Sequence, residues 1–121
     1  MSRTPLSAVA RFEIGCSDLR RSRAFYEGLF NWTVRSDNAI GYGFVEAGGE
    51  DSIPGGLWED LERPPAVVIY IQVADVEQAV ARAIELGARL VLPVTRIPGR
   101  IRFARIADPD NNIVGLIEGE W

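Results

Sequence analysis

The sequence predicts an α+β fold in which two βαβββ modules form a curved mixed sheet around a cleft. Strand and helix patterns follow one another in the same order in both halves of the chain. Asp18 and Asp75, each placed to cap a helix, lie 57 residues apart. The charged stretch 59–65 between the halves ends in two prolines, which is typical of a linker.

One domain is expected to hold both modules. The chain has 121 residues, and 47% of them are hydrophobic, which is enough for one compact core. We therefore expect a single domain over residues 1–121, with module one at about 8–60 and module two at about 66–118.

The first half begins with an alternating strand at residues 9–14, and Ser17-Asp18 then predicts a helix over 19–30. The apolar residues of that helix recur at helical spacing and are expected to face the sheet. They are Leu19, Phe25, Tyr26, Leu29 and Phe30. Three more strands are expected at 32–35, 42–46 and 53–58, the last weakened by Pro54 and two glycines.

The second half repeats this order. The β-branched run 67–73 predicts a strand, and Asp75 with Gln78 forms a capping-box pair at the start of a helix that should end at Gly87. The strands that follow are expected at 89–94, 102–107 and 113–118, with turn residues 108–112 before the last one.

Composition and charge exclude several functions. A formal net charge of −4 argues against a nucleic-acid partner, and no run reaches the roughly 20 apolar residues of a membrane span. Residues 1–10 do not resemble a signal peptide, and the single cysteine, Cys16, cannot form an internal disulfide. We expect a cytoplasmic protein with no membrane partner. The absence of histidine excludes Ser-His-Asp and Cys-His catalysis.

Alternation places four polar side chains on the cleft side of the first strands of the two modules. They are Arg11, Glu13, Tyr70 and Gln72. Arg11 and Glu13 are the most informative, because buried charges are paired or functional. They form either an anion clamp (Arg11) beside a carboxylate acid or base (Glu13), or a mutual or cross-module ion pair at a dimer edge.

Alternation does not determine which residues of the strand at 102–107 face the cleft. Either Phe103 and Arg105 or Arg102 faces the cleft. Because Arg100 and Arg102 flank Ile101, the preferred interpretation of the arginines is that they are solvated residues on an edge strand.

Five aromatic residues offer a pocket for a planar ligand: Trp32, Tyr42, Phe44, Trp58 and Tyr70. Core packing is preferred for Trp32 and Phe44, whereas both interpretations stay open for the other three. Cys16 precedes a helix N-cap, which can activate a thiol, but packing is the preferred interpretation.

Three segments together resemble a known superfamily. They are Phe12-Glu13-Ile14 through Ala24-Phe25-Tyr26, Asp75-Val76 through Leu86-Gly87-Ala88, and Asp108-Pro109-Asp110-Asn111-Asn112. With Pro54-Gly55-Gly56-Leu57 they are similar to the vicinal oxygen chelate proteins, which include glyoxalase I, bleomycin resistance proteins and extradiol dioxygenases. The resemblance covers nearly the whole chain and implies paired βαβββ modules and a homodimer.

Metal-binding members of this superfamily place one ligand on each of four strands. The resemblance puts these positions at Arg11, Gly56, Val68 and Gly115, and none of these side chains can chelate a metal. We therefore expect no metal and no cofactor. Glu46 and Glu118 are the carboxylates best able to rebuild a metal site, but they have no histidine partners.

The first functional hypothesis is a metal-independent protein that sequesters or carries an aromatic or anionic metabolite. Its expected ligand-binding residues are Arg11, Glu13, Tyr42, Trp58, Tyr70, Gln72, Phe103 and Arg105. The alternative is a metal-independent isomerase, lyase or cyclase, with Glu13 as base and Arg11 stabilising an oxyanion. A glyoxalase-type or dioxygenase-type metalloenzyme is the least favoured. The sequence leaves open whether the cavity lies within one chain or is shared across a dimer.

Overall fold

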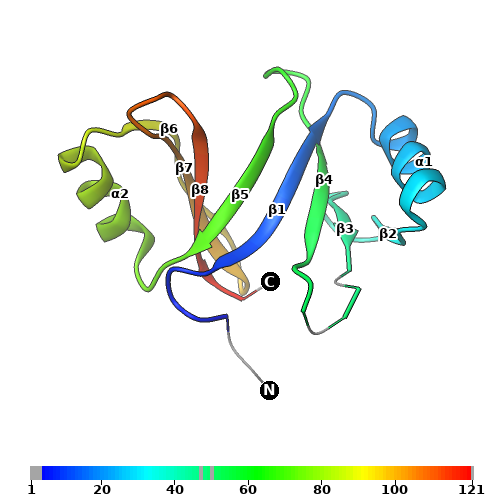
Figure 1. Cartoon of the computed structure of the whole chain (residues 1–121), viewed down its shortest axis with the longest axis horizontal. Helices are drawn as coiled ribbons and strands as arrows, with labels where there is room; N and C mark the ends of the chain where they lie inside the picture. Colours follow the sequence, from blue (N-terminus) through cyan, green and yellow to red (C-terminus); the bar gives the residue numbers. More distant parts are fainter. Residues whose placement is uncertain (1–3, 47, 50, 121) are drawn as a thin grey trace. The chain divides into compact units, whose positions relative to one another are not determined.

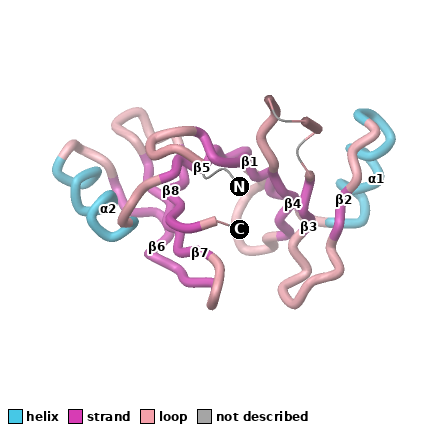
Figure 2. Tube along the Cα trace, turned by 90° about the horizontal axis from the view of Figure 1, so that it is seen from below, coloured by secondary structure: helices cyan, strands magenta, loops and turns pink. Residues whose placement is uncertain are grey.

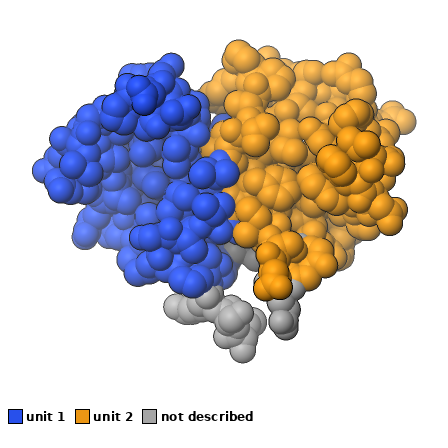
Figure 3. Space-filling view, viewed as in Figure 1, with its two compact units in different colours: residues 1–10, 69–121 blue, residues 11–68 orange. Residues whose placement is uncertain are grey.

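The computed structural model describes residues 4–46, 48–49 and 51–120. The chain divides into two compact units, residues 11–68 and residues 1–10 with 69–121 (Figure 3). In chain order the elements run βαβββ twice, giving eight strands and two helices over the described residues. This confirms the predicted α+β class and the two modules.

The first module is a four-stranded mixed sheet in the order β2-β3-β4-β1 (Figure 1). β1 (Val9–Cys16) pairs in parallel with β4 (Gly55–Glu59). β4 pairs antiparallel with β3 (Gly43–Val45), and β3 pairs antiparallel with β2 (Val34–Arg35). Helix α1 (Leu19–Phe30) follows β1 and covers one face of this sheet.

The second module repeats this plan in the order β5-β8-β7-β6 (Figure 2). β5 (Val67–Gln72) pairs in parallel with β8 (Ile113–Gly119), and β8 pairs antiparallel with β7 (Ile101–Ala107). β6 (Arg89–Ile97) forms the outer strand, three residues longer than expected. Helix α2 (Val76–Glu85) lies against β6, β7 and β8.

Apolar side chains of β1 that alternate with Arg11 and Glu13 face the helix of the first module. The core consists of Val34, Val45 and Leu57, with Phe12, Ile14, Leu19, Tyr26 and Trp32 packed around it. This confirms the predicted alternation of β1 and the core role of Trp32. Arg11 and Glu13 therefore lie on the opposite face of the sheet.

The predicted apolar face of α1 is only partly correct. Leu19 and Tyr26 reach the core, but Phe25, Leu29 and Phe30 are 58%, 60% and 53% exposed. The sheet beneath α1 is narrow, since β2 and β3 have only two and three residues. It can cover one row of helix side chains, and the other apolar residues stay in water.

The edge-strand interpretation of the arginines around Ile101 is wrong. β7 lies between β6 and β8 and forms ladders with both. Its Ala104 is buried in a second core with Val76, Val80 and Leu116. The local sequence showed polar residues, but strand order depends on pairing partners far away in the chain.

Both helices begin at the predicted N-cap. Asp18 accepts a hydrogen bond from the backbone N–H of Arg21, and Asp75 accepts one from that of Gln78, at 3.2 and 3.1 Å. Such a cap satisfies one of the free N–H groups of the first helical turn. No helix in the described part of the chain is long and apolar enough to cross a membrane.

A second carboxylate reaches each helix start from the last strand of the same module. Glu59 of β4 accepts a hydrogen bond from the N–H of Leu19, and Glu118 of β8 accepts one from the N–H of Val76, both at 2.9 Å. The sequence analysis missed this pairing, which is the clearest structural trace of the internal duplication. It places two negative charges at each positive helix end.

Candidate functional site

Arg11 and Glu13 occupy the face of β1 that points away from the core. Each is only 8% exposed, although both side chains are ionisable. The Nη2 atom of Arg11 donates a hydrogen bond to the carbonyl oxygen of Gly55 at 3.2 Å. Desolvation of a charge is costly, so such side chains are retained where their interactions or their function compensate.

Tyr42 joins this pair from the loop before β3. Its phenol oxygen donates a hydrogen bond to Oε1 of Glu13 at 3.0 Å, and the ring is buried. Asn38 holds the backbone of Tyr42: Oδ1 accepts the Tyr42 N–H at 3.0 Å, and Nδ2 donates to the Tyr42 carbonyl at 2.8 Å. Asn38 is therefore a positioning residue that the sequence analysis missed, although its place in an Asn-containing turn was a usable signal.

Aromatic rings surround the guanidinium of Arg11. Its Cζ lies 5.7 Å from the ring centroid of Tyr42 and 5.8 Å from that of Phe44. Trp58 lies 5.7 Å from Tyr42, centroid to centroid. Phe44, which was expected in the core, instead lies on this face. A cation held between aromatic rings is stabilised by their quadrupoles and keeps its N–H groups oriented.

Glycines make room for tyrosine rings in both modules. A β-carbon added at Gly56 would lie 2.1 Å from the Tyr42 phenol oxygen, and one added at Gly115 would lie 2.2 Å from a ring carbon of Tyr70. Gly56 is the register neighbour of Glu13, and Gly115 is that of Tyr70. The two glycines thus occupy equivalent places, and in each module a tyrosine ring fills the space of a side chain.

The second module gathers a separate set of residues on the equivalent face of its sheet. Nε of Arg105 donates a hydrogen bond to the phenol oxygen of Tyr70 at 2.9 Å, and the Phe103 ring lies 6.2 Å from the Tyr70 ring. Phe103 and Arg105 therefore share the face of Tyr70, which decides the alternative left open by the sequence. Gln72 is buried and donates to the carbonyl of Gly119 at 2.9 Å.

Arg102 lies on the other face of β7, toward α2. Its Nη2 and Nε atoms donate to the two carboxylate oxygens of Glu118 at 2.8 and 3.2 Å, and Nη1 contacts Glu77. The hydrogen bonds from Arg102, followed by that from the Val76 N–H, hold the pKa of Glu118 below its usual range. The Arg102 guanidinium and the Glu118 carboxylate thus link α2 to the sheet.

The four positions suggested for a metal do not fit one. Arg11 is a cation, Val68 is a buried apolar residue, and the space at Gly56 and Gly115 is filled by tyrosine rings. Glu118 is engaged by Arg102, and Glu46 binds Arg35 at 2.6 Å. Within residues 4–46, 48–49 and 51–120, no three His, Cys, Asp or Glu side chains form a group suited to a metal.

Cys16 ends β1 and is buried. Burial is the largest influence on the pKa of its thiol and raises it, although hydrogen bonds from Ser22 and the Asp18 backbone oppose the shift. The thiol therefore favours its protonated, less reactive form, as expected for a packing residue.

Comparison with known proteins places this geometry in a family. A glyoxalase-like domain model matches residues 11–117. A hypothetical protein from Bacillus halodurans is 15% identical with a TM-score of 0.69, covering 94% of this chain and 95% of its own. Methylmalonyl-CoA epimerase from Mycobacterium tuberculosis is 17% identical with a TM-score of 0.65, covering 100% and 93%.

A further structure, from Vibrio splendidus, is a member of the glyoxalase/bleomycin resistance protein/dioxygenase superfamily. It is 18% identical with a TM-score of 0.62, covering 88% of this chain and 95% of its own. No curated protein sequence matches the chain. The match over residues 11–117 shows that this chain belongs to the glyoxalase-like domain family.

Proposed function

We propose that the face of the first module formed by Arg11, Glu13 and Tyr42 binds a small organic molecule without a metal ion. The observation that carries this proposal is the burial of two opposite charges, each 8% exposed, on the side of β1 away from the core. A hydrophobic pair would stabilise the same place at a lower desolvation cost. Retention of the charges supports a role in recognition.

The neighbours of Arg11 indicate the class of ligand. Its guanidinium offers several N–H donors in a planar fork that matches a carboxylate or an enolate. The rings of Tyr42, Phe44 and Trp58 add apolar, stackable surface within 6 Å of one another or of Arg11. We infer an aromatic or anionic metabolite as the ligand. The second module carries its own set of polar and aromatic residues on the equivalent face, and Tyr70, Gln72, Phe103 and Arg105 are proposed as ligand contacts within that module.

Thermal unfolding with a panel of aromatic carboxylates tests this proposal. A ligand at about 100 times its Kd should add roughly 2.7 kcal/mol to the free energy of unfolding. R11K keeps the charge but loses the planar fork, and should weaken binding about tenfold. The matched control is R35K, since Arg35 is exposed in the same module. The proposal fails if no compound raises the melting temperature, or if both variants bind equally.

A second candidate is a metal-independent isomerase, lyase or cyclase. The hydrogen bond from Tyr42 to Glu13 fixes a carboxylate that could remove a proton next to a substrate carbonyl, and Arg11 would stabilise the resulting enolate. Protonation of the enolate on the opposite face of the same carbon, or at another atom, would complete an isomerisation without a redox partner. The fold shared with an epimerase is compatible with this chemistry.

E13Q separates the two candidates once a ligand is known. An enzyme should lose turnover by about 100-fold or more while ligand binding persists, because the amide cannot accept the proton. E62Q is the control, since Glu62 is an exposed carboxylate in the stretch that joins the two modules. Unchanged turnover in E13Q would exclude Glu13 as the base. A homodimer, implied by the superfamily resemblance, stays a proposal that sedimentation velocity can test.

A further inference from the structure

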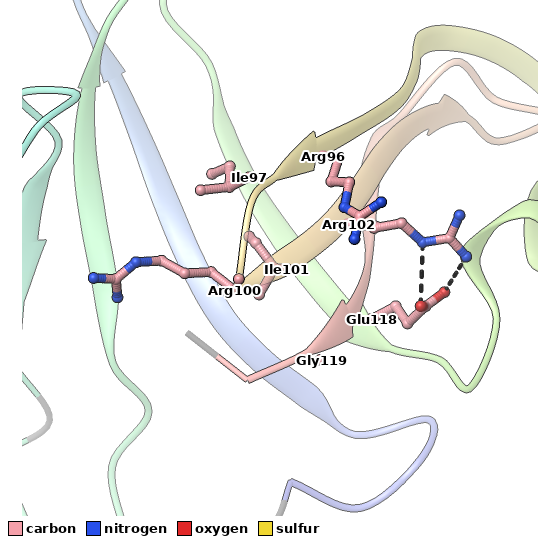
Figure 4. Close-up of a pocket in the computed structure, with 8 residues that line it drawn as sticks. Arg96, Ile97, Arg100, Ile101, Arg102, Glu118 and Gly119 are labelled. Carbon is pink, nitrogen blue, oxygen red and sulfur yellow. Dashed lines mark hydrogen bonds and ion pairs between the residues drawn. The ribbon is translucent and has the colours of Figure 1, made fainter.

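The hairpin between β6 and β7 borders a hollow of about 370 Å³ on the second module (Figure 4). It is lined by Arg96, Ile97, Gly99, Arg100, Ile101, Arg102, Glu118 and Gly119. All of these residues belong to the second module, whereas Arg11 and Glu13 belong to the first. Its volume falls within the range of small-ligand sites.

Positive charge exceeds negative charge in the lining. The lining holds three arginines and one carboxylate, Glu118, for a formal charge of +2 in a chain whose net charge is −4, while Glu77 and Asp75 lie against Arg102 from outside the lining. Arg96 and Arg102 are direct partners in the β6–β7 ladder. Like charges at directly opposed positions destabilise a sheet. An anion bound between them would reverse this repulsion.

Arg102 is held in place for such a role. Its guanidinium has five N–H groups, and three of them are used: two on Glu118 and one on Glu77. Glu118 is itself occupied by Arg102 and by the N–H of Val76. Nη2 of Arg102 also lies 4.0 Å from Oδ1 of Asp75. Two N–H groups of Arg102 thus remain on a guanidinium that three carboxylates hold in place, so little side-chain entropy is lost when a ligand binds.

Arg96 supplies the second set of donors. Within the described chain, its side chain makes no hydrogen bond or ion pair. Figure 4 shows Arg96 extending beside Arg102, whereas Arg100 points away from both. The contacts to a ligand would therefore come from Arg96 and Arg102, with Arg100 contributing only to the overall positive field.

We propose that this hollow binds a phosphate group, either inorganic phosphate or a phosphate monoester, between Arg96 and Arg102. Arginine recognises a phosphate through two parallel hydrogen bonds, and two arginines match its charge of nearly −2. Glu118, Glu77 and Asp75 lie against Arg102 and weaken the attraction, so affinity in the millimolar range is expected for the inorganic ion. A monoester should bind more tightly if the rest of the hollow holds its organic part.

The test is an NMR titration of the full chain with inorganic phosphate, and separately with glycerol 3-phosphate, at constant ionic strength. Saturable shifts are expected at the backbone amides of Gly99 and Gly119 and at the side-chain Nε–H of Arg96. R96Q should raise the Kd for phosphate about fivefold or more. The Kd of R96K should lie between those of the parent protein and R96Q. Tighter binding of glycerol 3-phosphate would identify an organic phosphate as the ligand class.

R82Q is the matched control, because it removes the same charge from an exposed position of α2. Its Kd should stay within about twofold of the parent value, since a screened surface charge contributes little. If R82Q and R96Q weakened phosphate binding equally, or if the chemical-shift changes did not saturate, the binding would be unspecific charge attraction. Either result would overturn the proposal. Because the shifts are read at Gly99, Gly119 and Arg96 and R96Q changes only the hollow, the outcome is independent of the ligand proposed at Arg11.

Discussion

The phenol oxygen of Tyr42 fills the place that a side chain at Gly56 would need. A β-carbon at Gly56 would lie 2.1 Å from that oxygen, which donates a 3.0 Å hydrogen bond to Glu13, the register neighbour of Gly56. The Tyr42 ring thus needs the space left by the glycine, and the buried carboxylate of Glu13 needs the hydroxyl of that ring as its hydrogen-bond donor. The glycine is needed because of close approach and not because of its backbone angles.

G56A is expected to destabilise the protein by about 1–3 kcal/mol, because the methyl group forces the Tyr42 ring to move within a packed site. Urea denaturation measures this loss. G28A is the matched control: nothing lies within 4 Å of a β-carbon there, and Gly28 is inside α1. That variant should gain about 0.5–1 kcal/mol. A neutral G56A would mean that the ring moves freely.

Y42F removes only the phenol oxygen that binds Glu13. We expect a loss of about 1.5–3 kcal/mol in the free energy of unfolding, because a buried carboxylate loses a charge-assisted hydrogen bond. Y26F in α1 serves as the control, since no hydrogen bond of the Tyr26 phenol is found within the described residues. If both variants were equally stable, the contact between Tyr42 and Glu13 would carry no net energy.

Glu118 should make stability depend on pH in the acid range. Arg102 and the Val76 N–H favour its ionised form, so its pKa in the folded protein lies below the ordinary value of 4.5. The unfolded chain therefore takes up the proton first. The contribution of Glu118 to stability is complete above its ordinary pKa and is lost as the pH falls through the folded pKa.

E118Q should be less stable than the parent at pH 7 by about 1–3 kcal/mol, and the difference should shrink as the pH is lowered through the acid range. Urea unfolding at a series of pH values measures this difference. E85Q is the control, because Glu85 is exposed and lies 3.6 Å from Arg82. A difference that stays constant with pH would contradict the assignment.

Cys16 should react slowly with iodoacetamide in the folded protein. Burial raises the pKa of its thiol and limits access of the reagent, so the alkylation rate at pH 8 should rise about tenfold or more when urea unfolds the chain. Mass spectrometry follows the reaction. Equal rates in the folded and unfolded states would mean that burial does not protect the thiol, and a faster rate in the folded state would indicate an activated thiol.

The local features of the fold could be predicted because they depend on neighbours in the sequence. Asp18 and Asp75 cap the helices as expected, since capping depends on residues three positions apart. The alternation of β1 correctly placed Arg11 and Glu13 on the face away from the core, because the side-chain period of a strand is fixed.

Features that depend on distant partners could not be predicted. Alternation gave two possible faces for Arg102 and Arg105, and only the packing of α2 on one side of β7 decided between them. Phe25 and Leu29 fit the helical period of α1 but are exposed, because the sheet beneath them is too narrow to cover them.

By itself, the sequence determined the order of the elements, the helix starts and the absence of chelating side chains at the four suggested metal positions, since all of these are properties of the residues along the chain. Only the tertiary structure decided that Tyr42 fills the space at Gly56 and that Tyr70 fills the space at Gly115. The physical reason is that a glycine in the sequence shows only that no side chain is present at that position. Which ring enters the free space depends on strand pairing and ring packing between distant segments.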